Sequence, residues 1–177
     1  MTSIILGVCG GIAAYKSAEL TRLLARAGHE VQVILTKSGE EFITPLTLQT
    51  LSGHPVHRDL FSLSEAAEIN HIALADRAQL VLVAPATADC LARVAHGLCN
   101  DLLTTVICAT RAPVVFAPAM NVHMWENTIT QRNVRLLTEC GYHIIPPATG
   151  EMACGHTGAG RLPEPAELVS AIERWLS

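Results

Sequence analysis

The sequence lacks the features that mark membrane, exported and nucleic-acid-binding proteins. Charged residues make up only 16% of its 177 residues and the formal net charge is −4, whereas nucleic-acid binding favours a basic face. No apolar run reaches the length of a membrane span. The first residues show no basic region followed by an apolar core and a cleavage site. We therefore expect a cytoplasmic protein that binds neither nucleic acid nor a membrane.

Paired cysteine motifs are also missing. None of the six cysteines forms a C-x-x-C pair, and Cys154 and His156 have no second ligand pair, so we expect no metal site. No G-x-S-x-G segment indicates a serine hydrolase. Cys154 lies beside a glycine in a polar loop, whereas the other cysteines lie in apolar stretches, where we expect buried and reduced thiols. These five are Cys9, Cys90, Cys99, Cys108 and Cys140.

Short apolar runs alternate with longer helical periods along the chain. Half of the residues are apolar, enough for one domain with a full core. The alternation predicts a single domain, residues 1–177, with the α/β architecture of a Rossmann- or flavodoxin-like doubly wound parallel sheet. The expected strands are residues 3–9, 31–35, 78–84, 113–117 and 142–145. The expected helices are residues 12–27, 87–95, 101–109, 127–140 and 164–176.

Two stretches do not follow this alternation, residues 38–67 and residues 146–163. The second is rich in glycine and proline, and long loops in compact domains are usually functional or mobile. We interpret it as a flap that covers a substrate. The apolar content is also high for a small monomer, so we expect part of the apolar surface to be buried between subunits.

Three loops that follow predicted strands should meet at one edge of the sheet. The first contains Gly10 and Gly11 and opens a helix, where backbone N–H groups favour an anion. It is not a G-x-G-x-x-G fingerprint, and residues 36–38 supply hydroxyls and a lysine instead of an acidic residue. A mononucleotide such as FMN therefore fits better than NAD, although a tight turn that needs glycine is an alternative. The second loop contains Thr87, which could instead cap a helix, and the third contains Asn121.

Residues 117–125, which read Ala-Pro-Ala-Met-Asn-Val-His-Met-Trp, combine amide, imidazole, thioether and indole side chains in one short segment. Loops at the carboxyl ends of parallel strands are where open α/β sheets bind ligands. A second dense segment, residues 150–161, contains Cys154, which could donate a proton or act as a nucleophile. We expect the two segments to form one composite site. Asn121 could hold a carboxylate or cap a helix, and His71 is either structural or an acid/base group.

Four of these segments together resemble the homo-oligomeric flavin-containing cysteine decarboxylases. Residues 10–16 are similar to the first phosphate loop of that family, and residues 70–72 to the motif of its catalytic histidine. Residues 118–125 match its P-x-M-N-x-x-M-W signature, and residues 153–161 match its flap, A-C-G-D-x-G-x-G-R. His156 departs from the flap pattern, which often has aspartate there, and this puts the role of that carboxylate in doubt.

The resemblance implies FMN as cofactor and decarboxylation of 4′-phosphopantothenoylcysteine to 4′-phosphopantetheine in coenzyme A biosynthesis. In this chemistry the cysteine is oxidised to a thioaldehyde, loss of carbon dioxide gives an enethiolate, and the hydride is then returned. Three catalytic residues are implied: His71 for carboxylate positioning and proton transfer, Asn121 for carboxylate binding, and Cys154 as the acid of the reduction. Met124 would join Asn121 in binding the substrate. The expected flavin contacts, which rest on loop position as well as resemblance, are Gly10, Gly11, Ser38, Thr87, Asp89 and Ala119.

The resemblance also implies an assembly and a partner. Members of the family form trimers or dodecamers with the active site between protomers, so we expect a homotrimer or a dodecamer. Phosphopantothenoylcysteine synthetase is implied as a fused or separate pathway partner. Two alternatives stay open: a peptidyl-cysteine decarboxylase that stops at the enethiol, and a flavin-binding regulatory subunit that is not an enzyme. The cysteine of a complete flap favours a protein that finishes the reduction.

Overall fold

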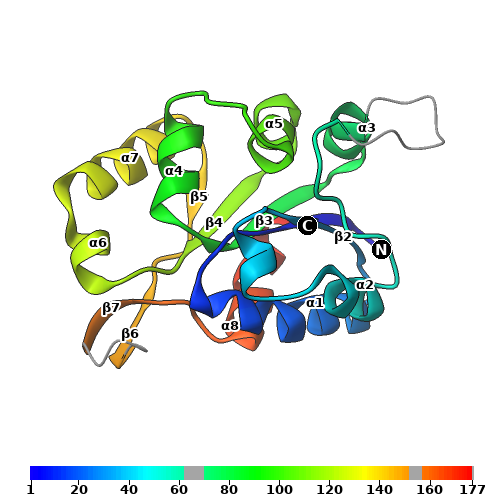
Figure 1. Cartoon of the computed structure of the whole chain (residues 1–177), viewed down its shortest axis with the longest axis horizontal. Coiled ribbons are helices and arrows are strands. Elements are labelled where there is room, and N and C mark those ends of the chain that lie inside the picture. Colours follow the sequence, from blue (N-terminus) through cyan, green and yellow to red (C-terminus); the bar gives the residue numbers. More distant parts are fainter. Residues whose placement is uncertain (62–69, 152–156, 177) are drawn as a thin grey trace.

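The computed structural model describes residues 1–61, 70–151 and 157–176 and contains a central parallel sheet. Its five strands lie in the order β2-β1-β3-β4-β5, and every neighbouring pair is parallel (Figure 1). This is the order of a flavodoxin-like doubly wound sheet, so the predicted fold class is confirmed. The strands are β1 (Ser3–Val8), β2 (Glu30–Leu35), β3 (Leu80–Ala86), β4 (Val114–Pro118) and β5 (His143–Ile144).

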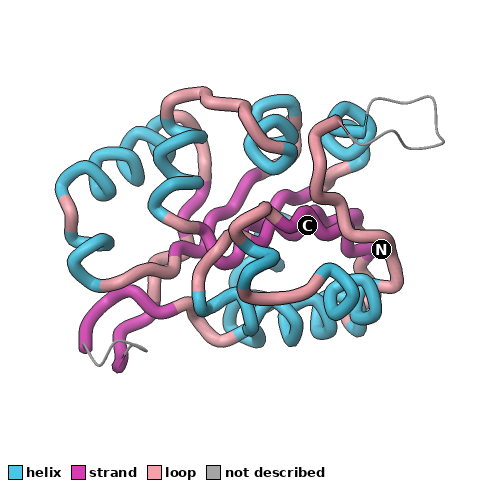
Figure 2. Tube along the Cα trace, in the orientation of Figure 1, coloured by secondary structure: helices cyan, strands magenta, loops and turns pink. Residues whose placement is uncertain are grey.

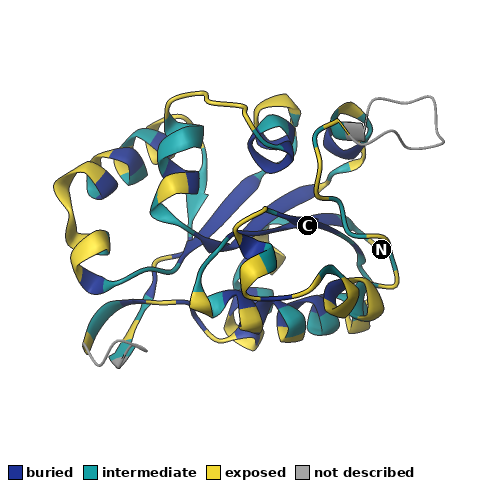
Figure 3. Cartoon of the chain, in the orientation of Figure 1, coloured by how far each residue is buried: buried dark blue, intermediate teal, exposed yellow. Residues whose placement is uncertain are grey.

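Helices cover both faces of this sheet. On one face α1 (Lys16–Arg26), α2 (Pro45–Ser52) and α8 (Pro165–Ile172) pack on a core that includes Leu20, Leu48 and Leu168. On the other face α3 (Asn70–Arg77), α4 (Ala88–Ala95), α5 (Leu102–Ala109) and α7 (Thr128–Glu139) pack on a second core that includes Leu74, Leu91 and Leu137. Figure 3 shows the buried residues along the strands and on the inner sides of the helices. None of the described helices is long and apolar enough to cross a bilayer.

Burial on both faces explains why the strands could be recognised in the sequence. All seven residues of β3 are buried, and so are all five of β4. A parallel strand covered on both sides must be apolar at every position, because neither side-chain direction reaches water. Full burial of one such leucine stabilises the fold by about 1.5–3 kcal/mol.

The structure adds elements that the sequence analysis did not expect. The predicted helix 12–27 begins as a 3₁₀ turn, Ile12–Tyr15, before α1. Within residues 38–67 lies α2, which Thr44 caps by accepting the N–H of Thr47 and which Gly53 ends with φ 76°. The short helix α6 (Val122–Glu126) begins within residues 117–125 and ends one residue beyond them.

The glycine-rich stretch 146–163 is built on a β-hairpin. Strand β6 (Ala148–Glu151) pairs antiparallel with β7 (Thr157–Arg161), outside the main sheet. Figure 2 shows these two strands side by side at the margin of the molecule. The expectation of a substrate flap falls partly on residues 152–156, which lie outside the described residues.

The expectation of buried cysteines is only partly correct. Cys9 and Cys90 are buried, but Cys99, Cys108 and Cys140 are exposed. Cys99 lies in the connection before α5, Cys108 lies near the end of α5 and Cys140 follows α7. In α5 the neighbouring Val106 and Ile107 are buried, so the apolar stretch around Cys108 did not show which side of the helix the cysteine occupies. A hydrogen bond with Cys9 and burial raise the pKa of the Cys90 thiol well above its usual range.

Candidate active site

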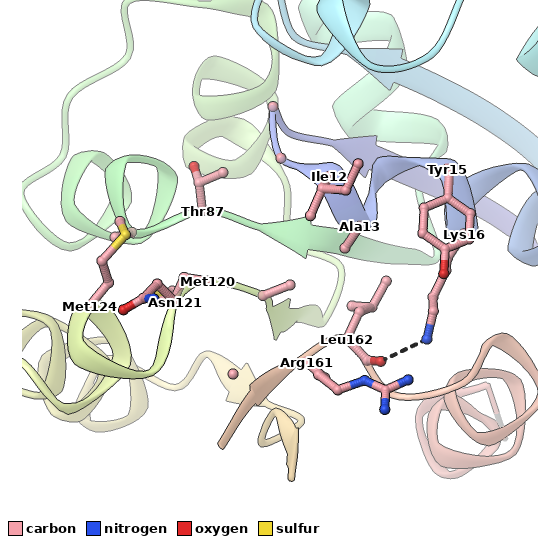
Figure 4. A pocket seen from close by; sticks show the side chains of 15 residues that line it. Ile12, Ala13, Tyr15, Lys16, Thr87, Met120, Asn121, Met124, Arg161 and Leu162 are labelled. Carbon is pink, nitrogen blue, oxygen red and sulfur yellow. Dashed lines mark hydrogen bonds between the residues drawn. The ribbon is translucent and has the colours of Figure 1, made fainter. Parts of the chain in front are cut away.

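A cavity of about 700 Å³ opens at the carboxyl ends of β1, β3 and β4. Figure 4 shows the side chains that line it, which come from the loops after these strands, from the start of α1 and from the end of β7. The three loops that were expected at one edge of the sheet therefore do line a common pocket. Its volume lies within the range of small-molecule and cofactor sites, about 300–1,000 Å³.

The first wall is the glycine loop between β1 and the 3₁₀ turn. A Cβ atom added to Gly10 would lie 2.5 Å from the Cβ of Ser38 and 2.6 Å from the Ser38 carbonyl oxygen, so this position admits no side chain. A Cβ at Gly11 would meet no atom within 4 Å. The first glycine thus lets the loop pack against residue 38, and the second leaves backbone open toward the cavity.

Ser38 belongs to a turn that is fastened to β1. The backbone N–H and the hydroxyl of Thr36 donate to the Val8 carbonyl at 3.1 and 3.2 Å. The Thr36 hydroxyl also lies 3.2 Å from that of Ser38 and accepts the N–H of Gly39 at 3.1 Å. These bonds place Ser38 beside Gly10, but Ser38 is not among the residues that line the cavity.

The second wall is the loop that begins α4. The hydroxyl of Thr87 accepts the backbone N–H of Cys90 at 3.2 Å, so Thr87 caps the helix and also lines the cavity. Asp89, in the first turn of the helix, does not line the cavity. Its carboxylate pairs instead with Arg93 at 2.9 Å, and Arg93 also contacts Asp101 at 3.0 Å.

The third wall joins the two dense segments of the sequence. The backbone N–H of Met120 donates to the carbonyl of Gly160 in β7 at 2.9 Å. The side-chain oxygen of Asn121 accepts the N–H of His123 at 2.9 Å and caps α6. A Cβ on Gly158 would lie 2.7 Å from a methyl carbon of Val122, so the hairpin packs directly on this helix. The signature segment and the flap segment therefore meet, as a composite site requires.

A buried lysine ties the end of β7 to α1. The Nζ atom of Lys16 donates to the carbonyl of Leu162 at 3.2 Å and to Oε1 of Glu164 at 2.7 Å. The Lys16 side chain is 10% exposed and that of Glu164 is 57% exposed. The hydrogen bond from Lys16 holds the pKa of the Glu164 carboxyl below its usual value. A buried ammonium needs such partners, because an unpaired buried charge is costly.

The structure brings together some of the predicted site residues and not others. The cavity is lined by Gly10, Gly11, Thr87, Ala119, Asn121 and Met124. His71 lies in the first turn of α3 and does not line the cavity, and its Nδ1 is buried without a hydrogen-bond partner in the described parts of the chain. Cys154 lies outside the described residues. The catalytic trio therefore remains a prediction.

Two cationic lining residues were not given a role in the sequence analysis, Lys16 and Arg161. Both stood at the ends of recognised motifs, yet their position at the same end of one cavity, beside Glu164, needs the fold to be known. No group of three or more metal-binding side chains occurs among residues 1–61, 70–151 and 157–176.

Comparison with known proteins identifies a family to which the chain belongs and several similar proteins. A family model described as Flavoprotein matches residues 1–177. The coenzyme A biosynthesis bifunctional protein CoaBC of Vibrio vulnificus is 53% identical over 172 residues, which are 97% of this chain and 43% of that protein. CoaBC of Bacillus subtilis is 46% identical over 97% of this chain and 42% of its own length. The chain thus spans less than half the length of these curated relatives.

Solved structures support the same relationship. A mutant PPC decarboxylase complexed with pantothenoylaminoethenethiol has a TM-score of 0.87 and 32% identity, with 99% of each chain covered. The FMN binding protein AtHal3 has a TM-score of 0.84 and 32% identity, with 98% of this chain and 96% of that chain covered. The likeness extends over the whole fold, including the hairpin segment.

Proposed function

Because this chain belongs to the Flavoprotein family, we propose that it uses FMN to decarboxylate 4′-phosphopantothenoylcysteine to 4′-phosphopantetheine. The observation that carries the proposal is the composite cavity, in which the glycine loop, the Met120–Asn121 segment and the end of the hairpin line one space. The names of the relatives, a coenzyme A biosynthesis protein and a PPC decarboxylase, support the substrate.

The residues present fit FMN. The backbone at Gly11 faces open space at the start of a helical segment, which suits an anionic phosphate. The alanine, methionine and isoleucine side chains of the lining suit a flat aromatic ring system. Gly10, Gly11, Thr87 and Ala119 would hold the cofactor, with Ser38 and Asp89 at its margins. When bound, FMN supplies the acceptor and donor of the two electrons that the substrate carbon loses and regains.

Asn121 is the lining residue that we assign to the substrate carboxylate. Its Oδ1 is engaged as the cap of α6, so the amide is held in one orientation and its Nδ2 is the atom proposed to donate to the substrate. Met124, one turn later and half exposed, would pack against the pantothenoyl chain. Holding the carboxylate this way would favour the loss of carbon dioxide by fixing its orientation.

His71 and Cys154 complete the proposed chemistry. His71 would position the carboxylate and transfer a proton in the oxidative stage, and Cys154 would supply a proton in the final reduction. Since His71 does not line the cavity of its own chain, we propose a homotrimer or dodecamer in which it reaches the cavity of a neighbour. The exposed apolar side chains of Ile12 and Tyr15 at the cavity are consistent with cover by a second copy. A monodisperse monomer in light scattering would contradict this assembly.

Two further parts of the proposal come from the relatives. The curated ones are bifunctional proteins, which supports phosphopantothenoylcysteine synthetase as a fused or separate partner. Their role in coenzyme A biosynthesis also supports a cytoplasmic location.

Product analysis by mass spectrometry tests the reaction. The flavin-loaded protein and its Cys154→Ser variant would each be incubated with 4′-phosphopantothenoylcysteine, with Cys140→Ser as a matched control at an exposed cysteine outside the cavity. We expect phosphopantetheine from the parent protein and the control, and an enethiol-derived product from Cys154→Ser. Absence of carbon dioxide release from every protein would refute the proposed function.

A further inference from the structure

The charged side chains among the described residues of the cavity wall are both cationic. They are Lys16 and Arg161, and no acidic side chain lines the cavity with them. Figure 4 shows both on the same side of the cavity, at the end away from Asn121 and Met124. A cationic end opposite the proposed carboxylate site indicates a ligand that is anionic at its other end as well.

The two cations differ in how closely they pair with other residues of the protein. Lys16 is buried and gives its hydrogen bonds to the Leu162 carbonyl and to Glu164 at 2.7 Å. Arg161 approaches the same Glu164 carboxylate only at 3.6 Å, and its side chain is 41% exposed. Since Lys16 already pairs closely with Glu164, Arg161 is the less fully paired of the two cations that line the cavity.

The hairpin also leaves room for the Arg161 side chain to lie across β6. Gly150 in β6 pairs with Gly158 in β7, and a Cβ on Gly150 would lie 2.8 Å from Nη1 and 3.0 Å from Cδ of Arg161. The absence of a side chain at Gly150 therefore lets the arginine lie over β6. An alanine there would push the guanidinium aside without removing its charge.

From these observations we infer that Arg161 is the specificity residue that binds the phosphate of the pantothenoyl substrate. The inference rests on the proposed function. A planar guanidinium binds phosphate with paired, charge-assisted hydrogen bonds. The phosphate of 4′-phosphopantothenoylcysteine is at the opposite end of the molecule from its cysteine, as Arg161 is from Asn121 in the cavity. The flavin phosphate is assigned to the glycine loop and needs no second cation.

Steady-state kinetics with paired substrates test this assignment. The parent protein and Arg161→Gln would be assayed with 4′-phosphopantothenoylcysteine and with pantothenoylcysteine, which keeps the carboxylate but lacks the phosphate. We expect the substitution to lower kcat/KM for the phosphorylated substrate by about 10- to 100-fold, the range of a charge-assisted hydrogen bond. For pantothenoylcysteine the change should stay within about threefold, since the lost contact is absent there.

Three further variants separate a local role from a structural one. Arg161→Lys keeps the charge but not the paired geometry, and we expect an intermediate loss. Gly150→Ala should weaken the same discrimination by a smaller factor. Arg22→Gln changes an arginine that pairs with Glu19 on the outer side of α1, and it should leave both substrates unaffected. Calorimetric titration with 4′-phosphopantetheine and pantetheine gives the same comparison in binding, without turnover.

Each contrary result has a defined meaning. An equal loss for both substrates in Arg161→Gln would overturn the assignment, because the arginine would then act on the carboxylate or on the structure. Loss of flavin from that variant during gel filtration would overturn it in favour of the flavin phosphate. If the parent protein turns over neither substrate, the proposed function fails and this assignment fails with it; if the parent is active and does not prefer the phosphorylated substrate, only the assignment fails.

Discussion

Replacement of Gly10 with alanine should both destabilise the protein and weaken its flavin binding. The added Cβ would lie 2.5–2.6 Å from Ser38 atoms, two of which belong to the backbone. Comfortable carbon contacts lie near 3.5–4.0 Å, so the loop and residue 38 must separate by about 1 Å. The turn that carries Ser38 cannot yield without strain, because Thr36 ties it to the Val8 carbonyl through two hydrogen bonds.

The expected cost is about 1–3 kcal/mol, the usual range for an overpacked site. For a chain of this size it corresponds to a fall in Tm of about 2–4 °C per kcal/mol. Gly11→Ala is the matched control, since its Cβ meets no atom within 4 Å. We expect Gly11→Ala to keep the free energy of unfolding within about 0.5 kcal/mol of the parent value while still lowering flavin affinity.

Urea unfolding of the flavin-free proteins and fluorescence titration with FMN separate the two effects. Stability should fall for Gly10→Ala alone, and flavin affinity should fall for both variants. An alanine at position 10 that leaves the unfolding free energy unchanged would refute the close packing against Ser38. Unchanged flavin affinity in both variants would refute the assignment of the cofactor phosphate to this loop.

Other predictions follow from the contacts of the site and the core. Thr87→Ala removes the cap of α4 and should cost about 0.5–2 kcal/mol in urea unfolding, whereas Thr87→Ser should retain most of it. Leu82→Ala in the centre of β3, where the leucine is fully buried, should cost about 2–5 kcal/mol; a cost below 1 kcal/mol would contradict the packing. Lys16 lowers the pKa of Glu164 from its ordinary value of 4.5. The ion pair therefore stabilises the fold above about pH 4.5, and this stabilisation is lost as the pH falls through the lowered pKa of Glu164 in the folded protein. Glu164→Gln should therefore be less stable than the parent at pH 7, with a smaller difference at pH 3; equal stability at both pH values would show that the ion pair contributes nothing.

The fold could be read from the sequence because both faces of the sheet are covered. A strand such as β3 is apolar along its whole length for that reason, and the intervening helical periods imply crossovers. The helices predicted from the sequence do not include α2, α3 or α6. The boundaries of α2 carry readable signals in Thr44, Pro45 and Gly53. Helix α6 is only five residues long, too short to show a helical period.

The site was predictable in part for a similar reason. The carboxyl ends of neighbouring parallel strands lie at one edge, so loops that follow β1, β3 and β4 had to meet there. Ser38 and Asp89 were close in sequence to that edge but do not line the cavity. Ser38 packs behind Gly10, and the Asp89 carboxylate turns to Arg93 on its own helix. The local sequence specifies where a residue lies along a helix or strand. It does not specify the direction in which the side chain points, because that depends on the residues that the side chain contacts.

The sequence by itself determined the α/β class, the parallel strands and the edge at which ligand-binding loops gather, because hydrophobic period and chain connectivity are local properties. Only the tertiary structure decided that the hairpin docks on α6 through Gly158, and that Lys16 and Arg161 share the Glu164 carboxylate at one end of the cavity. The Lys16–Glu164 contact joins residues near opposite ends of the chain, and the Gly158 contact joins two separate elements. Their distances depend on how α1, α8 and the hairpin pack, which no local pattern records.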